Sequence, residues 1–530
     1  MHWADVAASR LAERGNKHII AAGITPSGEF HIGHIREILT GEIISRACHH
    51  LGLEVDFIFI VDSADPLRKV YPFLHEDYSN YIGHQIGNIP PPDHNGRPDH
   101  EAFSNGLTYA QFFLQPFLEA LAEIGVRPRI VDNLEMYRMG KFEPFAKMAC
   151  ENIDVVREII ERVSGRELPD DWFPWTPLDT NGKLGDVSIT DYQHPIVTFV
   201  QNDGVVGTSD ISKGEGKLPW RIDWPARWSF NEITMEPFGK DHGTSGGSYD
   251  TGKELSAFFG YQAPEPLTYE WISLKGQGAM SSSVGNTIGP MEALRLVPPE
   301  ILRLLVTKTK PNKAIEFDTG MGLVTIADEY ERLASRDFEQ ELAQDNLSRR
   351  QKVQVEDAQA ALRYSVVAHG EEAVSESVSF RHLAMLAQIR TVDDDVFALL
   401  QESGMIENVS DSLKERLHRM RYWTSSQHFP EEMKIQLQST LSHDFIASRT
   451  DEDKRIYSEM KVLFQDVLWR SDELQSIFGQ VSNASGLPIR NVYKASYSLF
   501  LGSEKGPRLA PILEAWNRES VLALLEQALR

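Results

Sequence analysis

The stretch from residue 19 to residue 61 restricts the fold more than any other part of the chain. An apolar run at residues 19–22 (IIAA) leads into a Thr-Pro-Ser-Gly turn, and a second apolar run follows at residues 55–61 (VDFIFIV). Between these runs, apolar side chains recur at helical spacing, at Ile35, Ile38, Leu39, Ile43 and Ala47. A strand, a helix and a strand in this order predict a βαβ unit, and the turn that enters the helix is a natural anion site.

Glycine and proline divide the chain into two parts. Of the 37 glycines and 27 prolines, 31 and 23 lie before residue 331, which suits a turn-rich α/β region followed by helices. In the second part, Leu413, Leu417 and Met420 recur at helical spacing with charged residues between them. The long segment between the second strand and Trp220 predicts an insertion in the α/β region.

The composition is that of a soluble globular protein, with 41% apolar and 25% charged residues. The sequence has no membrane-spanning stretch and no secretion signal, so we expect a cytoplasmic protein without a membrane partner. The net charge of -24 argues against a long groove for DNA, although local basic patches can still contact RNA. Cys48 and Cys150 are too few for a disulfide framework or a cysteine zinc site.

Two histidines mark the start of the predicted helix. His31 and His34 are three residues apart, so their side chains share a face and point toward the turn. Imidazoles there could donate hydrogen bonds to phosphate oxygens, and Gly33 between them lets a base or a sugar approach the backbone. A histidine pair on a helix is by itself more often solvated or packed in a core, so this pair alone does not decide the function.

Two glycine-rich segments favour a nucleotide site. Residues 274–286 (LKGQGAMSSSVGN) offer hydroxyls and backbone amides that can wrap a polyphosphate. Residues 236–252 (EPFGKDHGTSGGSYDTG) place Gly239, Asp241 and His242 in one turn, where a carboxylate could bind ribose hydroxyls. Each segment alone is also typical of a surface turn, but the three motifs in this order are improbable by chance.

The order HIGH at residues 31–34, GKDH at 239–242 and AMSSS at 279–283 resembles the HIGH and KMSKS signatures of class I aminoacyl-tRNA synthetases. The finer resemblance is to the class I lysyl-tRNA synthetases, and it covers nearly the whole chain. It rests on MHWAD at 1–5, GITPSG at 23–28, LPWRIDWPARW at 218–228, GGSYDTG at 246–252, YEWISLKG at 269–276, VPPEILR at 297–303, KPNKAIEFD at 310–318 and YKASYSLFLGSEKGPRLAPIL at 493–513.

This resemblance implies an α/β fold, with a Rossmann-type catalytic core, a connecting insertion and an all-α helical anticodon-binding domain. We therefore expect the first half of the core at 1–65, the insertion at 66–205, the second half of the core at 206–275, the MSSS loop with a stem-contact segment at 276–330, and the helical domain at 331–530. The implied reaction is ligation of lysine to tRNA(Lys) through a lysyl-adenylate, with ATP and Mg²⁺ as cofactors.

The resemblance also implies roles for individual residues. The expected catalytic residues are His31, His34, Lys275, Ser281, Ser282 and Ser283. The expected ATP contacts are Pro26, Gly33, Gly239, Asp241 and Met280. The expected lysine contacts are Gly23, Thr25, Trp220, His242 and Tyr269. Aromatic faces hold an ammonium group by cation–π contacts of roughly 0.5 to 2 kcal/mol each, although Trp220 and Tyr269 also fit plain core packing.

The serine-rich loop departs from the general signature. Ala279 and Ser282 stand where KMSKS has lysines, so the usual mobile cation on the leaving pyrophosphate is missing. Either Lys275 or Lys240 supplies this charge, or magnesium and the serine hydroxyls carry more of it. We favour Lys275 together with the hydroxyls of residues 281–283.

Basic residues outside the core predict contacts with tRNA. Lys308, Lys310 and Lys313 follow the core, where contacts with the acceptor stem are expected. In the helical part, Arg419, Arg421 and Trp423, with neighbours Lys414, Arg416 and Tyr422, combine charge with stacking faces that suit unpaired anticodon bases. The same segment also fits a solvated amphipathic helix, and Arg508 is a weaker RNA contact.

We expect no protein-bound metal cluster, because the insertion has no CxxC motif and only the scattered histidines His84, His94 and His100. Two other functions stay open. A glutamate-type class I synthetase should present arginine to its substrate's side-chain carboxylate. A catalytically impaired tRNA-binding paralogue would keep the basic patches without activating an amino acid.

Overall fold

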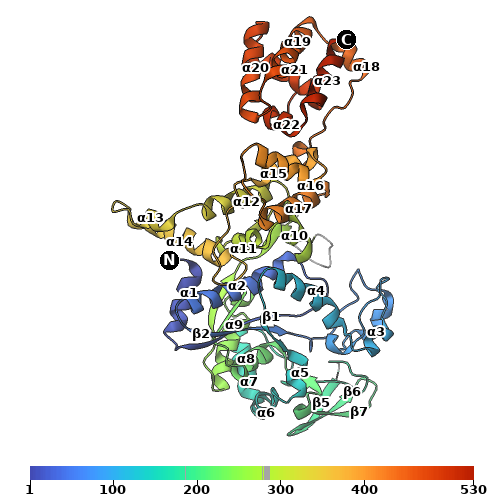
Figure 1. The fold of residues 1–530 in the computed structure, drawn as a ribbon. Helices are drawn as coiled ribbons and strands as arrows, with labels where there is room; N and C mark the ends of the chain where they lie inside the picture. Colours follow the sequence, from blue (N-terminus) through green and yellow to red (C-terminus); the bar gives the residue numbers. More distant parts are fainter. Residues whose placement is uncertain (186, 277, 280–286) are drawn as a thin grey trace. The chain divides into compact units, whose positions relative to one another are not determined.

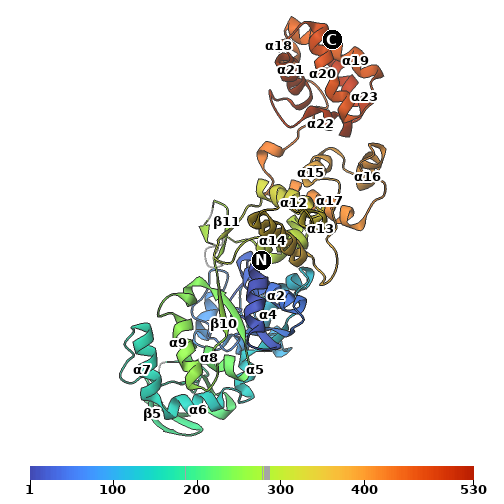
Figure 2. The same cartoon turned by 90° about the vertical axis from the view of Figure 1, so that its left-hand side faces the viewer.

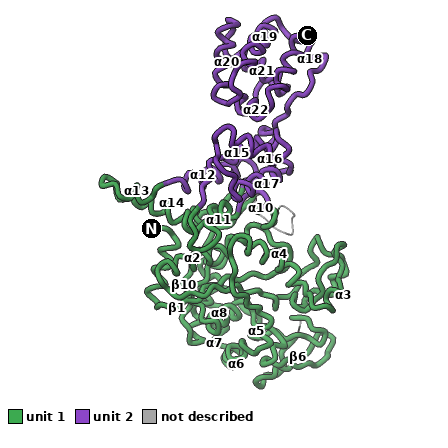
Figure 3. The backbone as a smooth tube through the Cα atoms, viewed as in Figure 1, with its two compact units in different colours: residues 1–294, 299–317, 337–373 green, residues 295–298, 318–336, 374–530 purple. Residues whose placement is uncertain are grey.

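The computed structural model describes residues 1–185, 187–276, 278–279 and 287–530. The predictions for Met280, Ser281, Ser282 and Ser283 therefore lie outside the described residues. The chain forms two compact units, coloured separately in Figure 3. The first comprises residues 1–294, 299–317 and 337–373, and the second comprises residues 295–298, 318–336 and 374–530.

Five parallel strands form the main sheet of the first unit, in the order β10-β9-β1-β2-β3. Their bounds are β1 Lys17–Ile24, β2 Glu54–Val61, β3 Arg129–Asp132, β9 Met235–Gly239 and β10 Glu265–Tyr269. The order reverses between β1 and β9, as in doubly wound folds. Helices α1 (Trp3–Ala12), α2 (Ile32–His50) and α4 (Tyr109–Glu123) cover one face, and α8 (Trp220–Phe230) and α9 (Ser248–Phe258) cover the other (Figures 1 and 2).

The predicted βαβ unit is confirmed as β1, α2 and β2. The two strands pair along their whole lengths, from Lys17 opposite Glu54 to Ile24 opposite Val61. The five apolar residues that predicted the helix face are all buried. Gly41 lets α2 approach the sheet closely, because a Cβ there would lie 2.6 Å from Cε2 of Phe57.

One part of the predicted domain division is wrong. Residues 66–205 were expected to lie outside the core, yet they contain β3, which pairs with β2 from Ile58 opposite Arg129 to Val61 opposite Asp132. The strand was missed because RIVD is short and half exposed, so it has little apolar pattern. Residues 337–373, which were predicted to lie in the helical domain, group with the first unit, and the assignment of residues 331–530 to anticodon binding stays a prediction.

The remaining elements of the first unit surround this sheet. The helices are α3 His100–Ser104, α5 Asn133–Arg138, α6 Glu143–Glu151, α7 Ile153–Ser164, α11 Pro299–Thr307, α13 Phe338–Leu342 and α14 Arg349–Ser365. The strands are β4 Thr176–Pro177, β5 Val187–Gln193, β6 Ile196–Gln201, β7 Val206–Asp210, β8 Gly216–Lys217, β11 Ile272–Leu274, β12 Gly278–Ala279 and β13 Ile315–Phe317.

A buried charge network ties α14 and the residues after it to α2. Arg303 pairs with Glu42 at 2.7 Å and donates to the carbonyl of Tyr364 at 2.8 Å. Arg46 also pairs with Glu42 and donates to the carbonyls of residues 366 and 367. Both guanidinium groups are thus satisfied by residues that follow position 337, and these residues group with the sheet rather than with the second unit.

The second unit is helical, as predicted. Its helices are α12 Met321–Ala334, α15 Phe380–Ile389, α16 Asp393–Glu402, α17 Asp411–Ser425, α18 His443–Ser448, α19 Asp451–Asp466, α20 Ser471–Ser485, α21 Ile489–Leu501, α22 Leu509–Ala515 and α23 Arg518–Leu529. The predicted apolar face of α17, formed by Leu413, Leu417 and Met420, is fully buried. Among the described residues, no helix is long and apolar enough to cross a membrane.

Candidate active site

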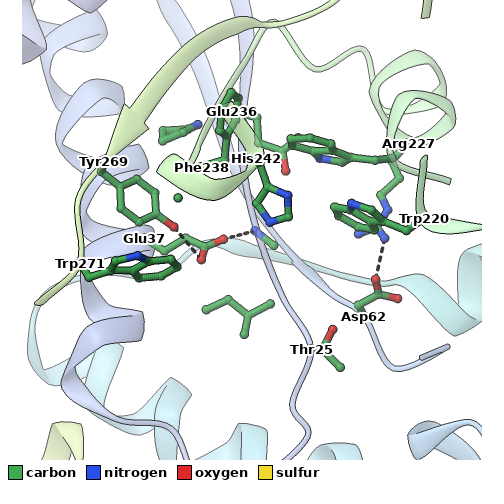
Figure 4. Close-up of a pocket in the computed structure, with 15 residues that line it drawn as sticks. Thr25, Glu37, Asp62, Trp220, Arg227, Glu236, Phe238, His242, Tyr269 and Trp271 are labelled. Carbon is green, nitrogen blue, oxygen red and sulfur yellow. Dashed lines mark hydrogen bonds and ion pairs between the residues drawn. The ribbon is translucent and has the colours of Figure 1, made fainter. Parts of the chain in front are cut away.

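A cavity of about 110 Å³ lies where β1, β9 and β10 end, beside the point where the strand order reverses (Figure 4). Such switch points are the usual ligand sites of parallel α/β sheets. All five residues expected to contact lysine line this cavity, namely Gly23, Thr25, Trp220, His242 and Tyr269. Gly239, expected to contact ATP, lines it as well, so the structure brings together residues that are far apart in the sequence.

Glu37 places a carboxylate in this cavity without an ion-pair partner among the described residues. Its Oε2 accepts a hydrogen bond from the Tyr269 hydroxyl at 2.9 Å, and its Oε1 accepts one from the Gly23 amide at 3.2 Å (Figure 4). Burial raises the pKa of Glu37 to about 7, although the two hydrogen bonds act in the opposite direction and lower it. A carboxylate held in this way is poised to receive a cation.

Aromatic rings form one wall of the cavity. Trp220 begins α8 and stacks on Trp224, with ring centroids 5.2 Å apart and planes 17° apart. His242 lies against both rings, at 5.8 and 5.5 Å, and burial lowers its pKa. Trp220 is 37% exposed, and the Arg227 guanidinium lies over its ring, with Cζ 4.9 Å from the centroid. These faces suit a methylene chain and an ammonium group.

The arginine of the cavity is already neutralised. Arg227 is buried and pairs with Asp62 at 2.6 Å and with Asp223 one helical turn away (Figure 4). Lys217 joins the same network, at 3.2 Å from Asp62 and 2.7 Å from Asp65. Two cations thus meet three carboxylates, and this network offers no spare positive charge for an acidic ligand.

The two histidines cap the amino terminus of α2. His31 Nδ1 accepts a hydrogen bond from the Gly33 amide at 3.1 Å, and His34 Nδ1 accepts one from the His31 amide at 3.1 Å. Because His31 Nδ1 accepts, the neutral His31 ring carries its proton on Nε2. His34 Nδ1 also lies 3.2 Å from the His31 carbonyl, so the amide contact requires the proton on Nε2 and the carbonyl contact requires it on Nδ1. Burial lowers the pKa of His31 to about 4 and that of His34 to about 3, so both rings are neutral donors near pH 7. Pro26 is buried in the turn that precedes them.

The other expected nucleotide residues lie along the ends of β9 and β10. Gly239 is buried, and a Cβ there would lie 2.9 Å from the ring of Trp271. Asp241 is exposed in the turn that follows. Lys240 is one of the two lysines considered as the source of positive charge on the pyrophosphate. Its ammonium group pairs with Glu270 at 2.8 Å. Lys275, the other one, has an exposed side chain.

The basic loop at residues 308–313 is attached to α2 through Arg36. The buried Arg36 guanidinium donates to the carbonyls of Lys313 at 2.8 Å and Pro311 at 3.0 Å, and more weakly to that of Lys310 at 3.4 Å. Lys308, Lys310 and Lys313 all have exposed side chains. The loop therefore turns its carbonyls inward and its ammonium groups outward, as a surface for RNA phosphates requires.

The helical unit corrects one RNA prediction outright. Trp423 is fully buried, and its Nε1 donates to the carbonyl of Thr319 at 2.8 Å. It packs against Phe429 and exposes no ring face, so its expected role in stacking on a base is wrong. Arg416 is buried too and pairs with Glu331.

The neighbouring arginines are engaged inside the same unit. Arg419 is buried and pairs with Glu415 at 2.6 Å. Arg421 pairs with Asp393 at 2.8 Å and donates to the carbonyl of Ala387 at 2.7 Å. Both guanidinium groups therefore serve the packing of α17 in this structure, and an RNA role for them stays only a prediction. Lys414, Tyr422 and Arg508 lie on the outside or at the edge of the unit.

Sequence reasoning missed the acidic residues of the cavity. Glu37 follows His34 by three residues and therefore shares its helix face, so this spacing could have identified it. Asp62 directly follows β2 at the edge of the sheet where ligands bind. Glu236 lies within β9, and no local signal separates it from an ordinary strand residue.

Comparison with known proteins identifies the family of this chain. The family model "tRNA synthetases class I (K)" matches residues 1–359. The lysine–tRNA ligase of Thermoplasma volcanium is 34% identical over 531 residues, covering 100% of this chain and 99% of that protein. The lysine–tRNA ligase of Archaeoglobus fulgidus is 35% identical over 537 residues, covering 99% and 100%. Among solved structures, a glutamate tRNA ligase from Elizabethkingia meningosepticum matches 97% of this chain and 99% of its own, with a TM-score of 0.46 and 14% identity. The chain belongs to the class I tRNA synthetases of the lysine type and is an aminoacyl-tRNA synthetase.

Proposed function

We propose that the cavity beside β1, β9 and β10 binds lysine, which the protein activates with ATP and ligates to tRNA(Lys). The observation that carries this proposal is the Glu37 carboxylate, which two neutral donors hold in an aromatic-walled cavity. A lysine ammonium group would supply the counter-charge that this carboxylate lacks. Its methylene chain would pack against the rings of Trp220 and Trp224.

The same cavity disfavours glutamate as the substrate. A glutamate side chain would meet Glu37, Glu236 and Asp62, all of which line the cavity. The one arginine among the lining residues, Arg227, already pairs with two aspartates. Burying another carboxylate there would leave it without a partner, which is costly.

The histidine cap suits the activation step. In that step an oxygen of the lysine carboxylate attacks the α-phosphorus of ATP, and the bond from this phosphorus to the pyrophosphate oxygen breaks. The neutral ring of His31 would offer an Nε2–H to the phosphate oxygens as negative charge shifts toward the pyrophosphate, and His34 would offer one in the tautomer that accepts from the His31 amide. Gly239 and Asp241 would hold the nucleoside, and Lys275 would supply charge near the pyrophosphate.

Magnesium would enter with the phosphates of ATP. Among the described residues, no group of three or more His, Cys, Asp or Glu side chains could hold a metal ion. We assign no step to the ion itself.

In the second step, a hydroxyl of the terminal tRNA adenosine attacks the lysyl carbonyl carbon and AMP leaves. The exposed Lys308, Lys310 and Lys313, on the loop that Arg36 holds, would contact the acceptor stem. Because this product serves protein synthesis, we also propose a cytoplasmic location.

Exchange of pyrophosphate into ATP, measured with each amino acid and with and without tRNA, tests this function. We expect exchange with lysine and none with glutamate. Pyrophosphate exchange with glutamate would show that the protein is a glutamate-type synthetase. If no amino acid supported exchange while tRNA still bound, the protein would be a binding paralogue and the proposal would fail.

A further inference from the structure

The cavity contains a second carboxylate that the proposed binding mode does not use. Glu236 lies on β9 and is only 6% exposed. Its Oε2 accepts a hydrogen bond from Nε1 of Trp228 at 2.7 Å. Among the described residues no cation forms an ion pair with Glu236, so this buried acid lacks a counter-charge, as Glu37 does.

The two carboxylates flank the same glycine. Glu37 Oε1 is 3.2 Å from the amide nitrogen of Gly23. Glu236 Oε1 is 3.9 Å from the point that a Cβ on Gly23 would occupy. Both line a cavity of about 110 Å³, and Figure 4 labels both among its lining residues. Two ionised carboxylates that line so small a cavity repel each other, and the charge of Glu236 raises the pKa of Glu37.

The other charged and titratable groups around the cavity form no ion pair with Glu37 or Glu236, although the charge of Arg227 lowers the pKa of Glu236 in part. They are Arg36, Asp62, Arg227, His242 and Tyr269. Arg227 pairs with Asp62, and Arg36 donates to backbone carbonyls. Burial lowers the pKa of His242 and, with the charge of Glu37, raises that of Tyr269 well above its usual value, so both are neutral near pH 7.

We propose that Glu37 and Glu236 act as a pair that holds one proton while the cavity is empty and releases it to solvent when the lysine ammonium group enters. The pair then changes from one negative charge to two, and the ammonium group adds one positive charge, so the total charge of the cavity stays the same. This proposal rests on the proposed function, because it takes lysine as the ligand.

Because the lysine ammonium group replaces the proton of the pair, Glu236 helps to determine which amino acid binds. A neutral side chain of similar length, such as that of norleucine, has no charge with which to replace the proton, so it gains nothing from the second carboxylate. The titration of the pair agrees with this account, since burial and, to a smaller extent, the charge of Glu236 raise the pKa of Glu37 to about 7. Burial also raises the pKa of Glu236.

Calorimetry of lysine binding to the full chain, in buffers of different ionisation enthalpy, counts the released protons. With a pair titrating near pH 7, we expect about three quarters of a proton per lysine at pH 6.5 and about a tenth at pH 8. The lysine amino groups keep their protons over this range. Lysine that binds without proton release at pH 6.5 would overturn the proposal. Absence of lysine binding, with and without tRNA, would instead overturn the proposed function.

Glu236→Gln keeps an acceptor for Trp228 and removes the second charge. We expect it to release less of a proton at pH 6.5 than the wild type does, because the remaining carboxylate loses its like-charged neighbour, and to reduce the preference for lysine over norleucine by about tenfold. Glu265→Gln, on β10 outside the cavity lining, is the matched control and should match the wild type. Wild-type values for Glu236→Gln in both measurements would refute the pair. Even if Glu236→Gln does not fold, a wild type that binds lysine without proton release still overturns the proposal.

Discussion

Replacing Glu37 by glutamine should weaken lysine binding while it stabilises the fold. Glutamine has the same shape and keeps an amide oxygen that can accept the hydrogen bond from Gly23 or Tyr269. What it removes is the negative charge. Loss of one partner from a desolvated charge pair costs about 2 to 5 kcal/mol, so we expect KM for lysine to rise from about 30-fold to several thousand-fold.

The effect on stability has the opposite sign. Burial raises the pKa of Glu37 from 4.5 to about 7, so the folded state binds this proton more tightly than the unfolded state does. The stability that the neutral acid contributes is present in full below pH 4.5 and is lost as the pH rises to about 7. Glutamine does not ionise, so its contribution to the free energy of unfolding does not fall as the pH rises. At pH 8, the free energy of unfolding of Glu37→Gln should exceed that of the wild type by about 1 to 3 kcal/mol, and near pH 4 the two should agree.

Two assays on the same preparations separate these effects. Lysine-dependent pyrophosphate exchange gives KM and kcat, and denaturant unfolding at pH 4 and pH 8 gives the stability. Glu265→Gln, which removes a carboxylate of β10 outside the cavity lining, is the control and should change KM for lysine little. If Glu37→Gln kept the wild-type KM, or if it were less stable than the wild type at pH 8, the carboxylate would serve the fold and not the ligand.

Three further substitutions test other parts of the structure. His31→Asn keeps an N-cap oxygen but loses the Nε2–H, so kcat for lysine activation should fall by roughly 10²- to 10³-fold. Because the pKa of His31 is lowered to about 4, the wild-type kcat should show no histidine titration between pH 6 and 8; an inflection there would contradict the neutral donor. Lys275→Ala should lower the rate of pyrophosphate exchange by roughly tenfold or more. Lys240→Ala should change this rate little, because the Lys240 ammonium group pairs with Glu270. A larger loss for Lys240→Ala than for Lys275→Ala would assign the charge on the pyrophosphate to Lys240. Trp423→Phe loses a buried hydrogen bond and should lower the free energy of unfolding by about 1 to 3 kcal/mol without changing KM for tRNA. A raised KM for tRNA at unchanged stability would show that Trp423 contacts RNA after all.

The sequence predicted the parts of the fold that have strong local patterns. The βαβ unit was readable because residues 19–22 and 55–61 are continuous apolar runs and the helix between them has a clear apolar face. The strand β3 was missed, since a four-residue strand at the edge of a sheet depends on its neighbour β2 more than on its own composition. The sequence predicted the aromatic residues of the cavity, because family motifs contain Trp220, His242 and Tyr269. It did not predict the acidic residues Glu37 and Glu236, because only the folded sheet brings them to the same cavity.

The prediction for α17 failed for a different reason. Its basic and aromatic residues looked suited to RNA, yet Arg416 and Trp423 are spaced three residues from Leu413 and Met420, on the face that the apolar residues define. The helical period already placed both on the buried side. Charge and aromatic character indicate a chemistry, but the period decides whether solvent or RNA can reach it.

The network around Glu42 limits where the protein can be divided. A fragment that ends near residue 330, the boundary that composition suggests, would lack the carbonyls that satisfy Arg303 and Arg46 inside the α/β unit. Two buried guanidinium groups would then face each other across a single carboxylate. A minimal fragment for crystallisation or for directed evolution of the lysine site must therefore retain residues 337–373, even if every residue of the second unit between and beyond them is removed or replaced by a short linker.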